Sequence, residues 1–225
     1  MRHASIEQSS SGFTLLVDGV AAKTPLGKNI ILPNAPLAEA IAEEWRAQDK
    51  IIHKETMPFT RMACVAIDLI RERRDEACAD LLAYCDTDVL CYRVGDIPEL
   101  LAQQSSLLDP LIAWATQRFS IELSVTHGIM PVIQKQENKA KIVAAIAAYN
   151  EWQFTVFATL VKPLCSLILS LAVMEKYIGA EQAFHLSHLE EIYETEKWGK
   201  DEEKETKMQV LKREIIAAEK FLGRL

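Results

Sequence analysis

The sequence is poor in glycine and lacks the glycine-rich motifs of nucleotide-binding and hydrolytic enzymes. It holds eight glycines in 225 residues, and GxGxxG, GxxxxGK(S/T) and GxSxG do not occur in it. These motifs supply the backbone amides that bind phosphate or the strained turn that presents a catalytic serine. We therefore expect neither a phosphate-binding loop nor a serine hydrolase. The five cysteines include no CxxC pair, which indicates reduced, mostly buried thiols in the cytoplasm.

The chain also lacks an excess of basic residues. Its 25 Lys and Arg against 32 Asp and Glu give a net charge of −7 and a pI near 5.3. Because phosphate binding needs a basic face, nucleic acid is not expected as a partner. The opening residues 1–12 (MRHASIEQSSSG) have neither the apolar core of a signal peptide nor the arginine-rich pattern of a mitochondrial presequence. The opening residues therefore give no signal for export or for mitochondrial import.

A long uninterrupted apolar run is missing too, although one stretch comes near it. Residues 163–178 (PLCSLILSLAVMEKYI) are apolar on every face for their first twelve positions, which predicts a helix enclosed by protein. Extension back to Phe154 would reach membrane-spanning length, but it would place Lys162 and Pro163 in the middle. A central lysine costs about 3 kcal/mol of insertion free energy, and the proline breaks the helix. We expect a central core helix and no insertion into a membrane.

The first third of the chain has the pattern of short strands and turns. Strands are expected at residues 13–17, 20–23 and 29–32, with residues 4–8 as a further edge, and Asp18-Gly19 is a hairpin signal. A helix over residues 36–48 follows, with Asn34 as its cap and Leu37, Ile41 and Trp45 as its apolar stripe. This part predicts a small antiparallel sheet with one helix.

The remainder is predicted to be helical. Helices are expected over residues 58–70, 75–84, 98–105, 110–119, 137–149, 152–161, 163–178, 180–198 and 202–222. Strands followed by helices, without βαβ alternation, indicate an α+β fold. We expect a β-rich domain at residues 1–57 and a larger all-helical domain at residues 58–225, built around the buried central helix.

Two clusters could serve a metal-dependent enzyme, and each has a simpler interpretation. Asp86 and Asp88 could hold a divalent cation, but a carboxylate at a turn also caps the element that follows. His185 and His188 could fall on one helix face as zinc ligands, but HExxH is absent and no third histidine or cysteine is near. The structural interpretation is favoured for both clusters.

An acidic stretch near the end of the chain has two interpretations. Glu190 and Glu194 are four residues apart and would repel each other on a helix, while Lys197 could relieve Glu194. A solvated polar face is one interpretation. The other is an acidic patch for a basic partner surface, with Tyr193 and Trp198 as aromatic anchors.

Several short strings, taken together and in order, resemble one family over nearly the whole chain. They are Thr24-Pro25-x-Gly27, Leu32-Pro33, the segment 37–45 ending in Glu44-Trp45, Met57-Pro58-x-Thr60-Arg61 with Ala66-Ile67-Asp68, Thr87-Asp88-x-Leu90-Cys91-Tyr92-Arg93, Asp109-Pro110, and Leu189-Glu190-Glu191-x-Tyr193 with Trp198-Gly199. Each string alone is weak, but seven in the right order are specific. The sequence is similar to the "ATP-twelve" family of assembly chaperones, which hold the unassembled alpha subunit of the F-type ATP synthase catalytic headpiece.

The resemblance implies a small sheet domain followed by a helical domain, and a protein that is not an enzyme and needs no cofactor or metal. Its implied partner is the alpha subunit, shielded until the beta subunit displaces the chaperone, with a monomer as the free form. With this resemblance, the lack of a presequence suggests a bacterial, cytoplasmic member, whereas eukaryotic relatives would work in the mitochondrial matrix. The partner-binding residues that it implies are Glu190, Glu191, Tyr193, Glu194 and Trp198. Structural or interdomain roles are implied for Trp45, Pro58, Arg61, Asp68, Asp88 and Arg93.

Two other functions stay open at this point. One is a helical adaptor with an unrelated protein partner, which composition alone cannot distinguish from the chaperone. The other is a metal-dependent enzyme that uses Asp86, Asp88, His185 or His188.

Overall fold

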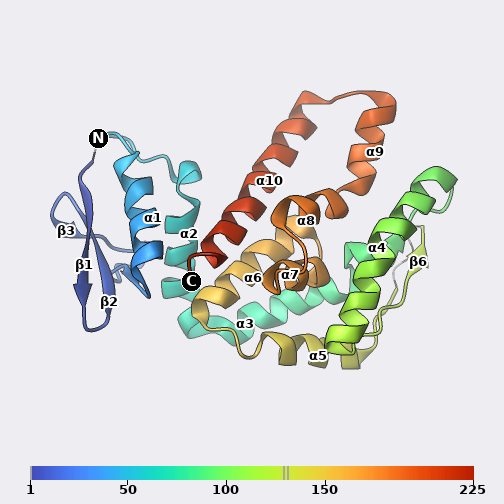
Figure 1. The fold of residues 1–225 in the computed structure, drawn as a ribbon, viewed down its shortest axis with the longest axis horizontal. Helices are drawn as coiled ribbons and strands as arrows, with labels where there is room; N and C mark the ends of the chain where they lie inside the picture. Colours follow the sequence, from blue (N-terminus) through green and yellow to red (C-terminus); the bar gives the residue numbers. More distant parts are fainter. Residues whose placement is uncertain (1, 129, 131) are drawn as a thin grey trace. The chain divides into compact units, whose positions relative to one another are not determined.

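The computed structural model describes residues 2–128, 130 and 132–225 (Figure 1). Its contacts divide the chain into two compact units. The first consists of Met1–Arg74, Tyr149–Val156 and Ala217–Leu225, and the second of Asp75–Ala148 and Phe157–Ile216. The division into domains at residues 1–57 and 58–225 stays a prediction. Residues that form a compact unit by their contacts are not thereby shown to fold as an independent domain.

The first unit begins with a four-stranded antiparallel sheet, as predicted. Strand β1 (Ala4–Ser9) pairs with β2 (Gly12–Val17), and β2 also pairs with β3 (Val20–Ala21) and β4 (Ile31–Leu32). Asp18 and Gly19 both have positive φ, 52° and 79°, which is the backbone of the two-residue turn that suits the twist of a hairpin.

Helix α1 (Ala35–Arg46) packs against this sheet. Asn34 caps it by accepting a 2.9 Å hydrogen bond from the Leu37 amide, which satisfies one of the orphan donors of the first turn. Leu37 and Ile41 are fully buried, and α1 contacts β1 and β2. The cap and the apolar stripe at Leu37 and Ile41 are therefore confirmed.

The next helical segment differs from its prediction. Helix α2 (Pro58–Val65) passes into a π-helical turn, η2 (Ala66–Ile70), and then into α3 (Arg71–Leu82). The charge cluster after residue 70 does not end the helix, because charged side chains on an exposed face are compatible with helical backbone. The break lies at Arg73, whose φ and ψ of −128° and 32° are not helical.

In the second unit, one helix replaces two predicted ones. Helix α4 (Pro98–Phe119) continues through Pro110, although an interior proline costs about 3 kcal/mol. Its buried residues Leu100, Gln104, Leu108, Leu111 and Ala115 form one continuous stripe across the proline. A buried leucine contributes about 1.5–3 kcal/mol, so the stripe as a whole outweighs the cost of Pro110.

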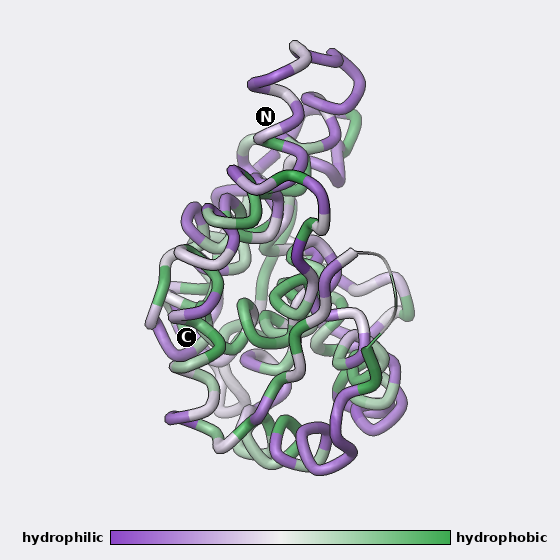
Figure 2. The backbone as a smooth tube through the Cα atoms, turned by 90° about the vertical axis from the view of Figure 1, so that its right-hand side faces the viewer, coloured by the Kyte–Doolittle hydropathy of each residue, from purple (hydrophilic) through white to green (hydrophobic). Residues whose placement is uncertain are grey.

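The central helix is buried as predicted but begins later. Helix α6 (Glu151–Leu164) includes Pro163, and α7 (Leu167–Met174) starts after Ser166, whose side chain accepts a 2.9 Å bond from the Leu169 amide. All eight residues of α7 are buried. In Figure 2 hydrophobic colours run through the interior of the helical part, and hydrophilic colours lie toward its outside. No helix in the described residues is long and apolar enough to cross a membrane.

The helix expected over residues 180–198 is two helices. Helices α8 (Ala180–Ser187) and α9 (Leu189–Trp198) are separated by His188, with φ −120° and ψ 30°. Gly199 ends α9 with a positive φ of 94°, and α10 (Glu202–Leu222) follows (Figure 1). The unit also contains α5 (Gln136–Ile146) and one parallel pair of two-residue strands, β5 (Tyr92–Arg93) and β6 (Thr126–His127). The predicted α+β class is confirmed, with a second part that is mostly helical.

Candidate functional site

The five predicted partner-binding residues share one ten-residue helix, α9. Its first residue, Leu189, is buried and fixes the helix to the unit, while Glu190 and Glu194 are exposed. Glu191 and Tyr193 are half-buried. Trp198, at the end of the helix, leaves 72% of its surface exposed. Because a tryptophan is rarely so exposed, the end of α9 is a candidate contact surface.

Glu190 makes a specific contact with helix α4. Its Oε1 atom accepts a 2.9 Å hydrogen bond from Nε2 of Gln104, and Oε1 of Gln104 accepts a 2.9 Å bond from the Val94 amide. Gln104 is buried, with 3% of its surface exposed. A neutral amide from the core therefore holds the exposed carboxylate.

Two other charged residues of α9, Glu194 and Lys197, form ion pairs. Glu194 accepts from Nζ of Lys204 at 2.7 Å. Glu99, at the start of α4, accepts from Nζ of Lys197 at 3.0 Å and from the Tyr193 hydroxyl at 3.1 Å. The Lys197 contact is the main cause of the lowered pKa of Glu99. These pairs are exposed and contribute little to stability, but they orient Tyr193 and Glu194 on the surface.

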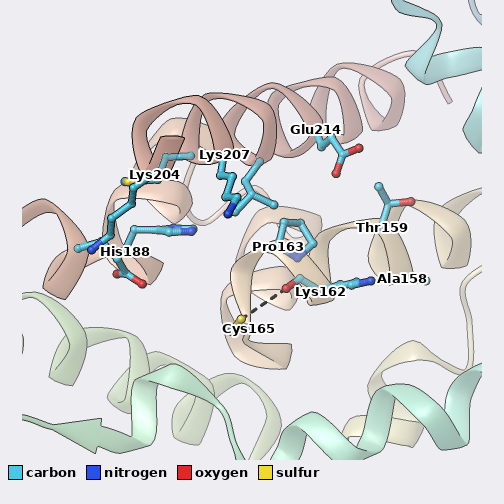
Figure 3. Close-up of a pocket in the computed structure, with 12 residues that line it drawn as sticks. Ala158, Thr159, Lys162, Pro163, Cys165, His188, Lys204, Lys207 and Glu214 are labelled. Carbon is cyan, nitrogen blue, oxygen red and sulfur yellow. Dashed lines mark hydrogen bonds between the residues drawn. The ribbon is translucent and has the colours of Figure 1, made fainter. Parts of the chain in front are cut away.

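A groove of about 650 Å³ opens beside the start of α9, and Figure 3 labels His188 and Lys204 among its lining residues. The groove is formed by residues of α6, α9 and α10, and its lining combines apolar side chains with lysines. These include Ala158, Pro163 and Met208, and the three lysines Lys162, Lys204 and Lys207. Glu191 and Glu214 also line the groove, and two of the lysines already form ion pairs on this chain, so the lining is mixed in charge.

His188, which also lines this groove, forms the junction of α8 and α9. Its Nδ1 lies 3.0 Å from the Phe184 carbonyl oxygen and 2.7 Å from Oγ of Ser187, and its ring stacks on Phe184 at 4.4 Å. Because a carbonyl oxygen only accepts, this geometry places the hydrogen on Nδ1. Local contacts thus hold the His188 ring at the point where the helix expected over residues 180–198 is divided into α8 and α9.

Two of the recognised strings meet in the first unit. Oγ1 of Thr24 donates a 2.7 Å bond to Oδ1 of the buried Asp68 carboxylate, and the Leu26 amide donates to Oδ2 at 3.2 Å. Asp68 lies on the π-helical turn η2, so it binds the turn of the Thr24-Pro25-x-Gly27 string to the helical segment.

The string ending in Glu44-Trp45 is connected to the start of α2 in the same way. The Glu44 carboxylate accepts from the amides of Phe59 and Thr60 at 2.7 and 2.8 Å and from Oγ1 of Thr60 at 2.7 Å. Burial raises the pKa of this carboxyl, against the opposing effect of those hydrogen bonds. Glu44 thus supplies the side-chain cap that α2 lacks locally.

The remaining predicted structural residues of the first unit lie on the same two helices. Pro58 is the first residue of α2, and Arg61 is exposed on it. Trp45 is half-buried on α1, and its Nε1 atom is buried without a hydrogen-bond acceptor in the described part of the chain. An interdomain role for these three residues stays a prediction.

Asp88 and Arg93 lie in the core of the second unit. Asp88 is 1% exposed, and its two oxygens accept from the amides of Leu90 at 3.1 Å and Ile168 at 3.2 Å. Burial raises its pKa to about 6. The Arg93 side chain, 2% exposed, donates to the Leu90 carbonyl at 2.7 Å and to Asp109 at 2.8 Å. Both residues therefore connect backbone segments.

The candidate metal ligands have other contacts. Asp86 accepts from Nζ of Lys139 at 2.6 Å, which lowers the pKa of Asp86, and Asp88 faces the start of α7. His185 is exposed and His188 is buried. Among residues 2–128, 130 and 132–225, no group of three or more His, Cys, Asp or Glu side chains could hold a metal ion.

The exposed acidic side chains and the exposed Trp198 of α9 have the composition of a protein-binding surface, which points to the class of binding proteins. The comparisons with known proteins agree with this class. The family model "ATP12 chaperone protein" matches residues 2–116. Protein atp12, mitochondrial, of Schizosaccharomyces pombe is 30% identical over 195 residues, which cover 81% of this chain and 67% of that relative.

Two solved structures match nearly the whole chain. Atp12 from Paracoccus denitrificans superimposes with a TM-score of 0.91 at 35% identity, covering 98% of this chain and 95% of that one. The Atu1473 protein of Agrobacterium tumefaciens gives 0.89 at 30% identity, covering 97% and 82%. The chain belongs to the ATP12 chaperone family, whose members are non-enzymatic assembly factors of the F-type ATP synthase headpiece.

The sequence did not indicate the contacts that hold the predicted residues in place. Gln104 gave no signal, because a single glutamine on a helix has no pattern that marks it as buried or as a partner of Glu190. Glu44 was part of a recognised string, but its contact with Phe59 and Thr60 depends on the packing of α1 against α2.

Proposed function

We propose that this protein binds the unassembled alpha subunit of the F-type ATP synthase headpiece and shields it until the beta subunit displaces the chaperone. The observation that carries the proposal is membership of the ATP12 chaperone family, supported by a structural match over 98% of the chain. The free protein is proposed to be a monomer. Bacterial and mitochondrial relatives both occur, and we propose that this chain works in the bacterial cytoplasm.

The physical basis is the apolar surface of a subunit that lacks its neighbour. Large exposed apolar patches aggregate, so an assembly factor must cover the patch and still release it. A modest interface with polar, exchangeable contacts meets both needs. The surface of α9, with the adjoining groove, has this composition: acidic groups, an exposed tryptophan and an apolar lining edged by lysines.

We assign recognition of the alpha subunit to Glu190, Glu191, Tyr193, Glu194 and Trp198. Glu190 stands first, because its carboxylate is exposed and held in place by Gln104. Trp198 would supply apolar contact area next to these charges. Tyr193 and Glu194 would act as oriented neighbours rather than as the strongest contacts, since each already has a partner on this chain.

The test is co-purification of the full chain with separately expressed alpha and beta subunits from the same cell. The expected result is capture of alpha alone, lost when beta is added. Glu190→Gln should weaken capture, whereas Glu196→Gln, which removes an exposed acid from the same helix, should leave it unchanged. Failure to capture alpha, or equal capture of beta, would overturn the proposal.

A further inference from the structure

Gln104 fixes the position of one carboxylate on the proposed binding surface. Its Oε1 atom faces the Val94 amide at 2.9 Å, and an amide N–H only donates. The side-chain amide therefore has one satisfactory orientation, with Nε2 directed at Glu190. Since Gln104 is buried and Glu190 exposed, the contact reaches from the core of the second unit to its surface.

The contact holds Glu190 without cancelling its charge. A lysine holds Glu194 at 2.7 Å and another holds Glu99 at 3.0 Å, so those carboxylates are largely neutralised. Glu190 receives a neutral amide, and in the described residues no basic nitrogen lies within ion-pair distance of it. Among these three acids, Glu190 is thus the one whose carboxylate is held by a neutral donor and has no ion pair in the described residues.

The contact also leaves Glu190 able to bind a partner. A carboxylate oxygen can accept more than one hydrogen bond, so the bond from Gln104 to Oε1 leaves acceptor capacity on both oxygens of Glu190. A lysine ammonium or an arginine guanidinium could therefore donate a charge-assisted hydrogen bond to this carboxylate.

We propose that Gln104 is a positioning residue that presents the pre-oriented carboxylate of Glu190 to a basic side chain of the alpha subunit. This inference rests on the function proposed above. Fixing the carboxylate before binding removes part of the ordering cost from the association step. A glutamine suits this task better than a lysine would, because it orients the acid and leaves its charge for the partner.

Affinity measurements on the full chain and purified alpha subunit test the positioning role. Gln104→Leu should weaken binding about tenfold in the wild-type background, and the effect should vanish in the Glu190→Gln background. Gln103→Leu makes the same chemical change at an exposed neighbour and should change nothing. Equal affinity of the Gln104 and Gln103 variants would overturn the inference, and so would equal losses with and without Glu190.

Ionic strength separates positioning from charge. Added salt should weaken wild-type and Gln104→Leu binding by a similar factor, because both keep the charge of Glu190, and should weaken Glu190→Gln binding less. A flat salt response in all three proteins would contradict a charged contact. If Gln104→Leu proves unstable in urea titration, Gln104→Met, which keeps the length of the side chain, takes its place.

Wild-type protein that fails to bind the alpha subunit at all would refute the proposed function instead of the positioning role of Gln104.

Discussion

Oδ2 of Asp88 accepts a 3.2 Å hydrogen bond from the backbone amide of Ile168, 80 residues further along the chain. This contact joins the acidic turn at Asp88 to the first turn of the central helix α7, next to the local cap Ser166. Amides at the start of a helix lack intrahelical acceptors, and all of α7 is buried. A carboxylate from another segment therefore completes the cap of a helix that water does not reach.

Replacement of Asp88 by alanine should destabilise the protein strongly. It would leave the Leu90 and Ile168 amides buried without that acceptor, at a cost of about 2–4 kcal/mol for the lost cap and the unpaired donors. Urea unfolding monitored by circular dichroism measures the loss. Asp80→Ala, an exposed acid on α3, should stay within about 0.5 kcal/mol of wild type; equal losses at the two sites would refute the capping role.

Asp88 should also make stability depend on pH in an uncommon direction. Burial raises its folded-state pKa to about 6 from 3.8, so between these values the folded protein binds more protons than the unfolded chain. The contribution of Asp88 to stability is then greatest below about pH 4 and falls as pH rises to about 6, by about 3 kcal/mol at most.

The check is the unfolding free energy of wild type minus that of Asp88→Asn, which cannot ionise at this position. This difference should be larger at pH 4.5 than at pH 7, because groups that titrate in both proteins cancel. A difference that grows with pH would show that Asp88 is more easily ionised in the folded state.

Glu44→Gln should destabilise the first unit, although the two side chains have nearly the same shape. The carboxylate accepts three hydrogen bonds from Phe59 and Thr60, whereas an amide would turn its own donors toward some of them. We expect a loss of about 1–2 kcal/mol, measured by chemical unfolding. Glu43→Gln, at the exposed neighbouring position, is the matched control and should be nearly neutral.

The sequence predicted the elements whose signals are local. The Asp18-Gly19 hairpin, the Asn34 cap and the end of α9 at Gly199 each depend on one or two residues, and each is present. The α+β class followed from the spacing of apolar residues, which changes from a strand-like to a helical pattern along the chain. The family strings added the class of function, which periodicity alone could not have supplied.

What could not be predicted depends on packing. Pro110 is a signal for a helix end, but it lies inside α4, because buried side chains on either side favour continuation. Pro163 lies inside α6 as well, although that helix ends one residue later, at Leu164. The break at His188 depends on its contacts with Phe184 and Ser187. The Gln104–Glu190 contact joins positions 86 residues apart, and no periodic pattern relates residues at that distance.

Trp198→Ala should weaken binding of the alpha subunit without destabilising the chaperone. The side chain is 72% exposed, so its removal takes little from the core, whereas an aromatic anchor desolvated in an interface contributes about 2 kcal/mol or more. We expect a drop in affinity of at least about tenfold, with the urea midpoint unchanged. Ile51→Ala removes another side chain that is 70% exposed, in the other compact unit, and should keep wild-type affinity. If Trp198→Ala binds alpha as tightly as Ile51→Ala does, the exposed end of α9 is not part of the interface, and recognition has to be sought along the groove beside Glu191.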